Sequence, residues 1–442
     1  MTGIPSSESI STKQARIAKL ARQMKGTALH SLSRHLDQSW LHEAHRRTRK
    51  GGAVGVDGQS GLEYGEELES NLDSLLRRAH TGSYRAPPVR RVEIPKGDGS
   101  KTRPIGIPTY EDKVLQRGVV MLLEPIYEEE FYDFSYGFRP GRSAHDALSQ
   151  LHRDLWRRGG GWVLDVDIRS FFDTINHDRL RHLVSQRVHD GVVLRLIGKW
   201  LRAGVLEDGS VHHPESGSPQ GGVISPLLSN IYLHEVIDRW WSEQVLPRLR
   251  GPASLVRYAD DLVMVFSVQS DAERVHRVLP HRLARYGLSL HPEKTRLVDF
   301  RRPSDTGSRP GSFSFLGFTH YWGRSRRGAW MPMRKTAKER FNRGLRSLNR
   351  WMRAARHVPL EKQVKTLGRK LAGHFNYYGI AGNSRSITSF AYRARCLWRK
   401  WLSRRSQRGR LTWEKFNRLL LRYPLPPARL RSRSRPVVSA KL

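Results

Sequence analysis

Apolar positions recur with a helical period through most of the first 80 residues. Ile17, Leu20 and Met24 lie three and four positions apart, and leucines repeat at similar spacing over residues 68–76. This periodicity predicts amphipathic helices. The glycine-rich stretch 50–58 interrupts the pattern and predicts a loop. We therefore expect a helical N-terminal extension over residues 1–80.

After residue 84 the helical period gives way to short β-prone segments. Residues 89–96 and 102–108 are rich in Val, Ile and Pro, and the turn sequence Gly97-Asp98-Gly99 lies between them. Two such segments on either side of a glycine turn are typical of a β-hairpin. The sequence therefore predicts a hairpin over this region.

The centre of the chain carries two apolar stretches that are interrupted by aspartates. Residues 162–168 are typical of a short buried strand, and residues 255–266 of two strands joined by an acidic turn. The helical period returns at about residue 335. Strands that alternate irregularly with helices between helical ends predict an α+β fold. The expected segments are 1–80, 81–330, 335–425 and a basic flexible tail at 426–442.

Composition narrows the class of protein. The chain has 442 residues, 38% of them hydrophobic, and a single Cys. These values allow sizeable cores but exclude an intramolecular disulfide framework and a Cys-rich zinc module. The sequence shows neither the pattern of a secretory signal nor an apolar run of membrane-spanning length. We expect a cytoplasmic protein of a reducing compartment, with no membrane partner.

The chain is strongly basic, and the basic excess is uneven. The net charge is +37, and residues 334–442 contain 30 Lys and Arg against 3 Asp and Glu. In this part the cations are interleaved with aromatic side chains such as Trp351, Tyr377 and Trp398. Phosphates bind cations and bases stack on rings, so the composition favours a nucleic-acid partner. A solvated helix face would explain single arginines but not the scarcity of acids.

Four aspartates occupy unusual positions. Asp165 and Asp167 interrupt an apolar strand, and Asp260 and Asp261 lie at the tip of an apolar hairpin. If both segments belong to one sheet, Asp167 meets the Asp260-Asp261 pair. Carboxylates so close repel one another unless a hard cation lies between them, and oxygen ligands favour Mg²⁺ or Mn²⁺. Such ions suit nucleotidyl transfer. The alternative is a solvated β-turn, where an Asp-Asp pair is ordinary.

An ordered series of motifs runs through the chain. It includes Asp167-Ile-Arg-Ser-Phe-Phe-Asp173 and Tyr258-Ala-Asp-Asp261, together with Gly55-Val-Asp-Gly58, Arg103-Pro-Ile-Gly-Ile-Pro108, Ser135-Tyr-Gly-Phe-Arg-Pro-Gly-Arg142, Ser216–Asn230 and Gly373-His-Phe-Asn-Tyr-Tyr-Gly379. The series closely resembles that of group II intron-encoded reverse transcriptases and maturases, over roughly residues 40–420. An ordered set of this kind is highly specific.

The resemblance implies a fold and a catalytic site. The fold would be a right-hand polymerase, with fingers and palm over 81–330 and an all-helical thumb or maturase domain over 335–425. Asp167, Asp260 and Asp261, with the Ile168 carbonyl oxygen, would bind the metal ions. Lys294 would protonate the leaving pyrophosphate, although any surface lysine could occupy its position.

The resemblance also implies residues that bind the incoming nucleotide. Lys96 and Arg103 would hold the triphosphate, whose charge grows during the transfer. Phe172 would crowd a ribose 2′-hydroxyl and so prefer dNTPs, or it is a plain core ring. Gln220 and Gly221, expected at the start of a helix, would let a template or nucleotide approach closely, or they form a simple turn.

Two further segments would serve the primer and the RNA. Residues 315–318 resemble a primer-grip hairpin, and equally any buried hairpin with a glycine. Residues 373–379 would either contact RNA or form the aromatic core of the thumb, and we favour the core for most of these rings. The basic helical region would bind the intron RNA that encodes the protein.

The chain departs from longer family members in one respect. With Cys396 as its only cysteine, we expect no His/Cys endonuclease, so the chain resembles the shorter bacterial lineages, whose mobility would use a 3′ end supplied by the host. We expect an RNA-directed DNA polymerase and maturase in a nucleoid-associated ribonucleoprotein, with intron RNA, template, primer, target DNA and dNTPs as partners. The alternatives are an RNA-binding splicing chaperone without a required polymerase activity and a related reverse transcriptase domesticated for host defence.

Overall fold

The structure, a computed structural model, describes residues 9–96, 101–207, 210–212, 221–304, 311–406 and 411–430. It divides into two compact units, one of Met1–Lys96 with Thr102–Asp299 and the other chiefly of Phe300–Leu442. Each unit contains its own cluster of buried apolar side chains. Helices and antiparallel sheets occur in both, so the expected α+β class is confirmed.

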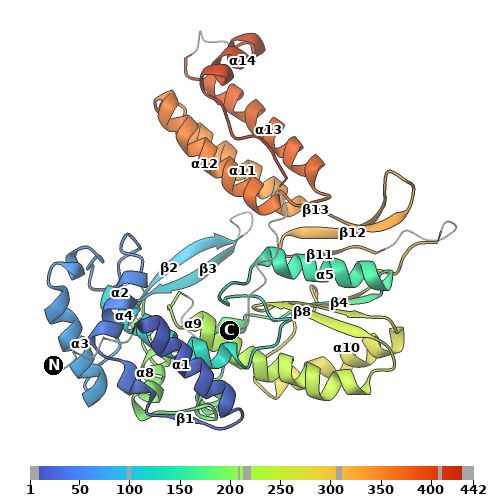
Figure 1. The fold of residues 1–442 in the computed structure, drawn as a ribbon. Helices are drawn as coiled ribbons and strands as arrows, with labels where there is room; N and C mark the ends of the chain where they lie inside the picture. Colours follow the sequence, from blue (N-terminus) through green and yellow to red (C-terminus); the bar gives the residue numbers. More distant parts are fainter. Residues whose placement is uncertain are drawn as a thin grey trace, which may run out of the picture. The chain divides into compact units, whose positions relative to one another are not determined.

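The N-terminal part of the first unit is helical, as expected. Its elements are α1 (Ile10–Gln23), β1 (Leu29–His30), η1 (Leu32–His35), α2 (Gln38–Arg47), η2 (Glu63–Gly65) and α3 (Leu68–Thr81). Ser9 and Asp37 cap α1 and α2 by accepting the Thr12 and Trp40 N–H groups, and Gly82 ends α3 with a φ of 83°. Helices α1 and α2 pack against α4 (Tyr110–Glu128) (Figure 1).

The hairpin that the sequence predicts after residue 84 is present. Strands β2 (Val89–Lys96) and β3 (Lys101–Ile107) are neighbours in a four-stranded sheet with the order β3-β2-β6-β7, completed by β6 (Val205–Glu207) and β7 (Ser210–His212). Figure 1 shows β2 and β3 as a long ribbon beside the N-terminal helices.

A run of helices fills the middle of the first unit. These are α5 (Ala144–Arg158), α6 (Phe171–Thr174), α7 (His177–Ser185), α8 (Gly191–Leu201), α9 (Ser225–Leu233), the π-helix η3 (His234–Val245) and the turn η4 (Leu246–Arg248), with strand β5 (Val188–His189) between α7 and α8. Helix α9 begins at Ser225 and has Pro226 in its first turn, where a missing N–H is tolerated. Our expectation that Gly221 starts this helix is therefore wrong.

A second four-stranded sheet lies at the centre of the first unit. It is formed by β4 (Trp162–Asp167), β8 (Ala253–Tyr258), β9 (Asp261–Phe266) and β10 (Arg296–Asp299), in the antiparallel order β10-β4-β9-β8. Helix α10 (Gln269–Ala284) packs on β4, β9 and β10, and α5 packs on β8. Both predicted aspartate-bearing segments are strands, and they belong to this one sheet.

The second unit joins a small sheet to a group of helices. Its strands are β11 (Phe313–Phe315), β12 (Phe318–Arg324) and β13 (Trp330–Thr336), and its helices are α11 (Lys338–Ala354), α12 (Leu360–Tyr378), α13 (Ser384–Leu402) and α14 (Trp413–Arg422). Leu348, Leu367, Phe375 and Trp398 are among the side chains of its core. The helical character predicted after residue 335 is confirmed. No helix in the described parts of either unit has the length and apolarity that a membrane span requires.

Candidate active site

Two neighbouring strands of the central sheet bring acidic residues together at their ends. Asp167, the last residue of β4, is the direct partner of Asp261, the first residue of β9. Tyr258 pairs with Asp261 in turn, so Ala259 and Asp260 form a two-residue turn between β8 and β9. The predicted meeting of Asp167 with the Asp260-Asp261 pair is therefore realised by backbone register.

Charge and burial couple these aspartates electrostatically. Burial raises the pKa of Asp260, and the charge of Asp167 raises it further. The Asp260 backbone N–H and the guanidinium of Arg103 act in the opposite direction. Arg103, from strand β3, is therefore close enough to Asp260 for its charge to be felt at the strand ends.

Residues 289–295 extend the edge of the sheet beyond β4. The His291 N–H donates to the Asp167 carbonyl oxygen at 2.8 Å, and the Arg169 N–H donates to the Ser289 carbonyl oxygen at 2.8 Å. These bonds flank a bridge between Ile168 and Leu290. The segment brings the Lys294 Nζ to 3.2 Å from the Asp167 Oδ2. Lys294 therefore belongs to the same cluster as the aspartates.

The donors present suit a divalent cation. In the part of the chain that the structure describes, no three His, Cys, Asp or Glu side chains already form a closed metal-binding cluster, and the Lys294 ammonium lies against Asp167 instead. The donors around the strand ends are carboxylate oxygens, and Asp260 is a half-buried acid whose ionisation a nearby cation would favour. Members of the reverse transcriptase family generally use divalent metal ions, and this donor set fits one.

The other predicted nucleotide-binding residues are placed as follows. Arg103 is exposed on β3. Phe172, on α6, is half-buried and has its ring 5.3 Å from the buried ring of Phe171. Lys96 ends β2, but its side chain lies outside the described residues. Gln220 also lies outside them.

Gly221 lies in a turn with a φ of 120°. A Cβ at this position would come within 2.4 Å of the Gly106 carbonyl oxygen and 2.7 Å of the Ile105 side chain. The absence of a side chain therefore allows close packing against β3, and a larger residue would displace the strand that carries Arg103.

The segment 315–318 is the predicted hairpin of the second unit. Strand β11 ends at Phe315 and β12 begins at Phe318, with Leu316 and Gly317 at φ values of 49° and 79° between them. The Tyr377 hydroxyl donates to the Leu316 carbonyl oxygen at 2.9 Å, and the Tyr378 ring packs on Phe318. Phe375 belongs to the core of the helices and Tyr378 packs against it, as we favoured from the sequence, whereas Tyr377 is bonded to the hairpin instead.

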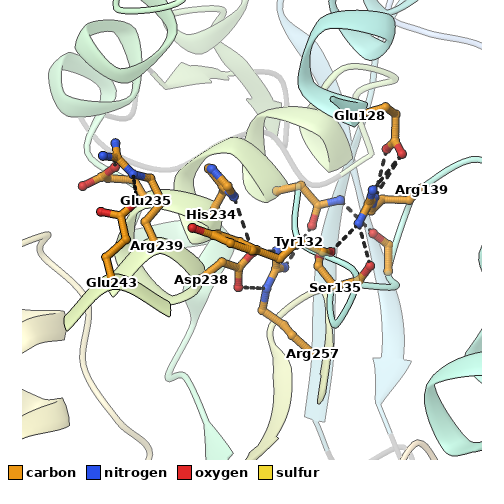
Figure 2. Close-up of polar contacts among 12 residues, drawn as sticks. Glu128, Tyr132, Ser135, Arg139, His234, Glu235, Asp238, Arg239, Glu243 and Arg257 are labelled. Carbon is orange, nitrogen blue, oxygen red and sulfur yellow. Dashed lines mark hydrogen bonds and ion pairs between the residues drawn. The ribbon is translucent and has the colours of Figure 1, made fainter. Parts of the chain in front are cut away.

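Sequence reasoning missed the buried polar residues beneath the turn. Arg257, Asp238 and Asn230 are almost fully buried and bonded to one another. Figure 2 shows the Arg257 and Asp238 side chains pointing toward each other, with His234 nearby. The available signal was an arginine in the middle of an otherwise apolar strand segment.

Comparison with known proteins agrees with this geometry. The family model described as reverse transcriptase (RNA-dependent DNA polymerase) matches residues 94–320. Protein YkfC of Escherichia coli strain K12 is 36% identical over 325 residues, which cover 65% of this chain and 84% of that protein. Group II intron-encoded protein LtrA of Lactococcus lactis subsp. cremoris is 41% identical over 192 residues, covering 41% of this chain and 32% of LtrA.

A plant relative is named as an intron maturase. Nuclear intron maturase 2, mitochondrial, of Arabidopsis thaliana is 29% identical over 231 residues, covering 44% of this chain and 30% of that protein. The matches thus span most of YkfC but about a third of LtrA and of the plant maturase. The chain belongs to the reverse transcriptase family of RNA-dependent DNA polymerases, and within it to the group II intron-encoded reverse transcriptases and maturases.

Proposed function

We propose that this chain extends a DNA primer along an RNA template at the edge of the central sheet, and that it binds the structured RNA of a group II intron to assist splicing. The cDNA would serve the mobility of that intron into target DNA. In this reading, residues 81–330 act as fingers and palm and residues 335–425 as the thumb or maturase domain of a right-hand polymerase. Residues 1–80 are a helical extension, and 426–442 are a basic tail.

The placement of Asp167 opposite Asp261, with Asp260 in the adjoining turn, carries the proposal. Neighbouring strand ends of one sheet are a rigid way to hold three carboxylates together. Ionised carboxylates at these positions cost folding free energy, because burial and the charge of Asp167 both raise the pKa of Asp260. Such perturbed acids are concentrated at functional sites.

Asp167, Asp260 and Asp261, with the Ile168 carbonyl oxygen, would hold Mg²⁺ or, in its place, Mn²⁺. Bound there, the ions would stabilise the negative charge on the attacking and leaving oxygens. The β4–β9 register fixes the positions of the Asp167 and Asp261 carboxylates relative to each other. Lys294, whose ammonium already lies 3.2 Å from Asp167, would deliver a proton to the departing pyrophosphate.

The incoming dNTP would lie between the two sheets of the first unit. Arg103, together with Lys96, would bind the triphosphate, and the effect of Arg103 on the Asp260 pKa supports its nearness to the chemistry. Gln220 and Gly221 would face the nucleotide or the template, with Gly221 packed on the strand that carries Arg103. The half-buried ring of Phe172 would crowd a ribose 2′-hydroxyl and so favour dNTPs over rNTPs.

The second unit supplies a surface for RNA. Helix α11 buries Leu348 and Met352 on one side. Its other side exposes the cations Lys338, Arg340, Arg346, Arg350 and Arg353, against the single acid Glu339. Such a charged helix face binds phosphates by counterion release and makes the affinity steeply dependent on salt.

Primer extension tests this proposal. Purified protein would be given an RNA template, a DNA primer, dNTPs and Mg²⁺, and compared with the double variant Asp260→Ala/Asp261→Ala. RNA binding would be measured for both proteins over a range of salt concentrations, so that lost binding is not mistaken for lost chemistry. The wild type should make cDNA, and the double variant should bind RNA but extend nothing.

Two other outcomes would contradict parts of the proposal. Extension by the double variant would show that the chemistry lies elsewhere. Tight binding of structured intron RNA by both proteins without any extension would favour a splicing chaperone, for which the cations of α11 would be the working surface.

A further inference from the structure

Arg257 is a buried arginine close to the catalytic turn. It lies in strand β8, three residues before Asp260, and its side chain is 0% exposed. A guanidinium in such a place costs free energy unless it is paired and fully hydrogen-bonded. Its Nε donates to the Asp238 Oδ1 at 2.7 Å and its Nη2 donates to the Asp238 Oδ2 at 2.5 Å. Figure 2 shows this two-pronged pairing.

Asp238 is held by a π-helix, a rare element that is often found at functional sites. Its carboxylate is 0% exposed. The imidazole of His234, one turn earlier, has its Nδ1 3.8 Å from the Asp238 Oδ2. Burial lowers the pKa of His234 to about 3, so at neutral pH this ring is uncharged. Arg257 is therefore the cation that neutralises Asp238, and each fixes the orientation of the other.

The third nitrogen of the guanidinium reaches beyond this pair. The Arg257 Nη1 donates to the Asn230 Oδ1 at 3.0 Å and to the Ala259 carbonyl oxygen at 3.1 Å. Asn230 in turn donates from Nδ2 to the Gly137 carbonyl oxygen at 2.7 Å. The bond to Ala259 is the important one, because the Ala259 carbonyl belongs to the peptide that leads into Asp260.

Ala259 needs such a restraint. Its φ of 55° is left-handed, which costs a residue with a side chain about 1–2 kcal/mol. Residues in this conformation persist only where their surroundings determine it. On the other side of the turn, Gly137 packs so closely that a Cβ there would lie 2.3 Å from the Ala259 nitrogen. The turn is thus held between a buried cation and the loop around Gly137.

We propose that Arg257 is a positioning residue for the metal-binding aspartates, which holds the strained Ala259-Asp260 turn through the Ala259 carbonyl while Asp238 fixes its guanidinium. The inference rests on the proposed role of Asp260 as a metal ligand. It adds a device that keeps this aspartate in place before any metal or nucleotide binds. Preorganisation of this kind lowers the cost of assembling a metal site.

The conservative variant Arg257→Lys tests the role. A lysine keeps the positive charge, but its single ammonium cannot replace the planar guanidinium that bonds to both Asp238 and the Ala259 carbonyl oxygen. The matched control is Arg187→Lys. Arg187 is also buried and bonds to Glu130 and to the backbone carbonyls of Ala21 and Met24, all away from the catalytic turn. Both variants should unfold at lower temperature than the wild type.

Direct metal binding is the readout, since it does not depend on polymerase turnover. Mn²⁺ added to the full-length protein would be followed by electron paramagnetic resonance, with Asp260→Ala/Asp261→Ala defining the background. Arg257→Lys should weaken Mn²⁺ binding about tenfold, the effect of losing roughly one charge-assisted hydrogen bond. It should raise the Mg²⁺ concentration for half-maximal extension by the same factor, while Arg187→Lys changes neither. Unchanged Mn²⁺ binding in Arg257→Lys would overturn the inference.

Failure of the proposed function looks different in this experiment. If wild type and Asp260→Ala/Asp261→Ala bind Mn²⁺ equally, the aspartates are not the metal site at all. If the two differ but Arg257→Lys matches the wild type, only the positioning role is lost.

The double variant Arg257→Lys/Ala259→Gly covers the case in which Arg257→Lys does not fold. Glycine adopts the left-handed conformation without the penalty, so less depends on the arginine. The double variant should regain thermal stability and part of the Mn²⁺ affinity, and such coupling is expected of residues in contact. An equal loss with Ala or Gly at position 259 would mean that Arg257 serves the ion pair alone, and would overturn the inference.

Discussion

Lys294 forms an ion pair with Asp167, its Nζ 3.2 Å from the Oδ2, although 127 residues separate the two in the chain. The contact depends on the backbone bonds that fasten residues 289–295 to the end of β4. Asp167 in turn faces Asp261. The Lys294 ammonium and the carboxylates are therefore held together at one sheet edge.

Removal of the Lys294 ammonium should slow nucleotide incorporation while strengthening metal binding. Lys294→Ala should slow single-nucleotide incorporation about 100-fold, the usual contribution of a general acid. The same change removes a cation that competes for Asp167, so Mn²⁺ should bind more tightly. Rapid-quench kinetics and a Mn²⁺ titration measure the two effects. An unchanged incorporation rate in Lys294→Ala would show that this lysine is only a structural partner of Asp167.

Gly137 should tolerate no side chain. In Gly137→Ala the new Cβ would meet the Ala259 nitrogen at 2.3 Å and the Tyr258 carbonyl carbon at 2.9 Å, and backbone atoms cannot rotate away. We expect a loss of about 1–3 kcal/mol in the free energy of unfolding, as for overpacked sites, and a higher Mg²⁺ requirement in primer extension. The control is Gly65→Ala, where nothing lies within 4 Å of the added Cβ. Equal effects in both variants would contradict the close approach.

Local pattern was sufficient to predict the parts of the fold that depend on neighbours in sequence. Apolar runs that end in aspartates predict the strands that carry Asp167 and Asp261. Their place in one sheet was predicted because a metal site would need all of these carboxylates close together. We placed the start of the helix too early because we took the glycines, and not Pro226, as its starting signal. In a first turn proline is favourable, so it marks the beginning of α9 better than glycine does.

The buried polar pairs could not be predicted from pattern, because their partners are distant in the chain. Arg257 of β8 meets Asp238 of the π-helix only in the folded structure, and 19 residues separate them in the chain. Asp112 is similar: its acceptors meet donors from Tyr84 and Trp200, which lie on other segments. Periodicity identifies which positions are buried, but not which buried polar groups satisfy one another.

Asp112 should make stability depend on pH. Its fully buried carboxyl accepts bonds from Tyr84, Trp200 and Gln116, but burial dominates and raises its pKa from 3.8 to about 6. Because the folded-state pKa exceeds the unfolded-state value, its contribution is complete below about pH 4 and is lost as pH rises through about 6.

The variant Asp112→Asn lacks this titration. Urea unfolding of both proteins at several pH values should show the wild type losing about 2–3 kcal/mol relative to Asp112→Asn between acidic and neutral pH. A difference that is constant with pH would mean that the carboxyl titrates normally.

The Tyr377 hydroxyl should matter for the primer more than for the fold. The hydroxyl donates to the Leu316 carbonyl oxygen at 2.9 Å. This bond lies in a turn in which Leu316 has a φ of 49°. Tyr377→Phe should cost about 1 kcal/mol of stability, as for one lost hydrogen bond. If the turn supports the primer 3′ end, KM for primer–template should rise while KM for dNTP stays constant. Tyr321→Phe, in the same small sheet with its ring beneath Lys335, is the control. A matching rise in KM for primer–template in the control would assign the effect to the sheet as a whole, and an unchanged value in both would remove the turn from primer binding.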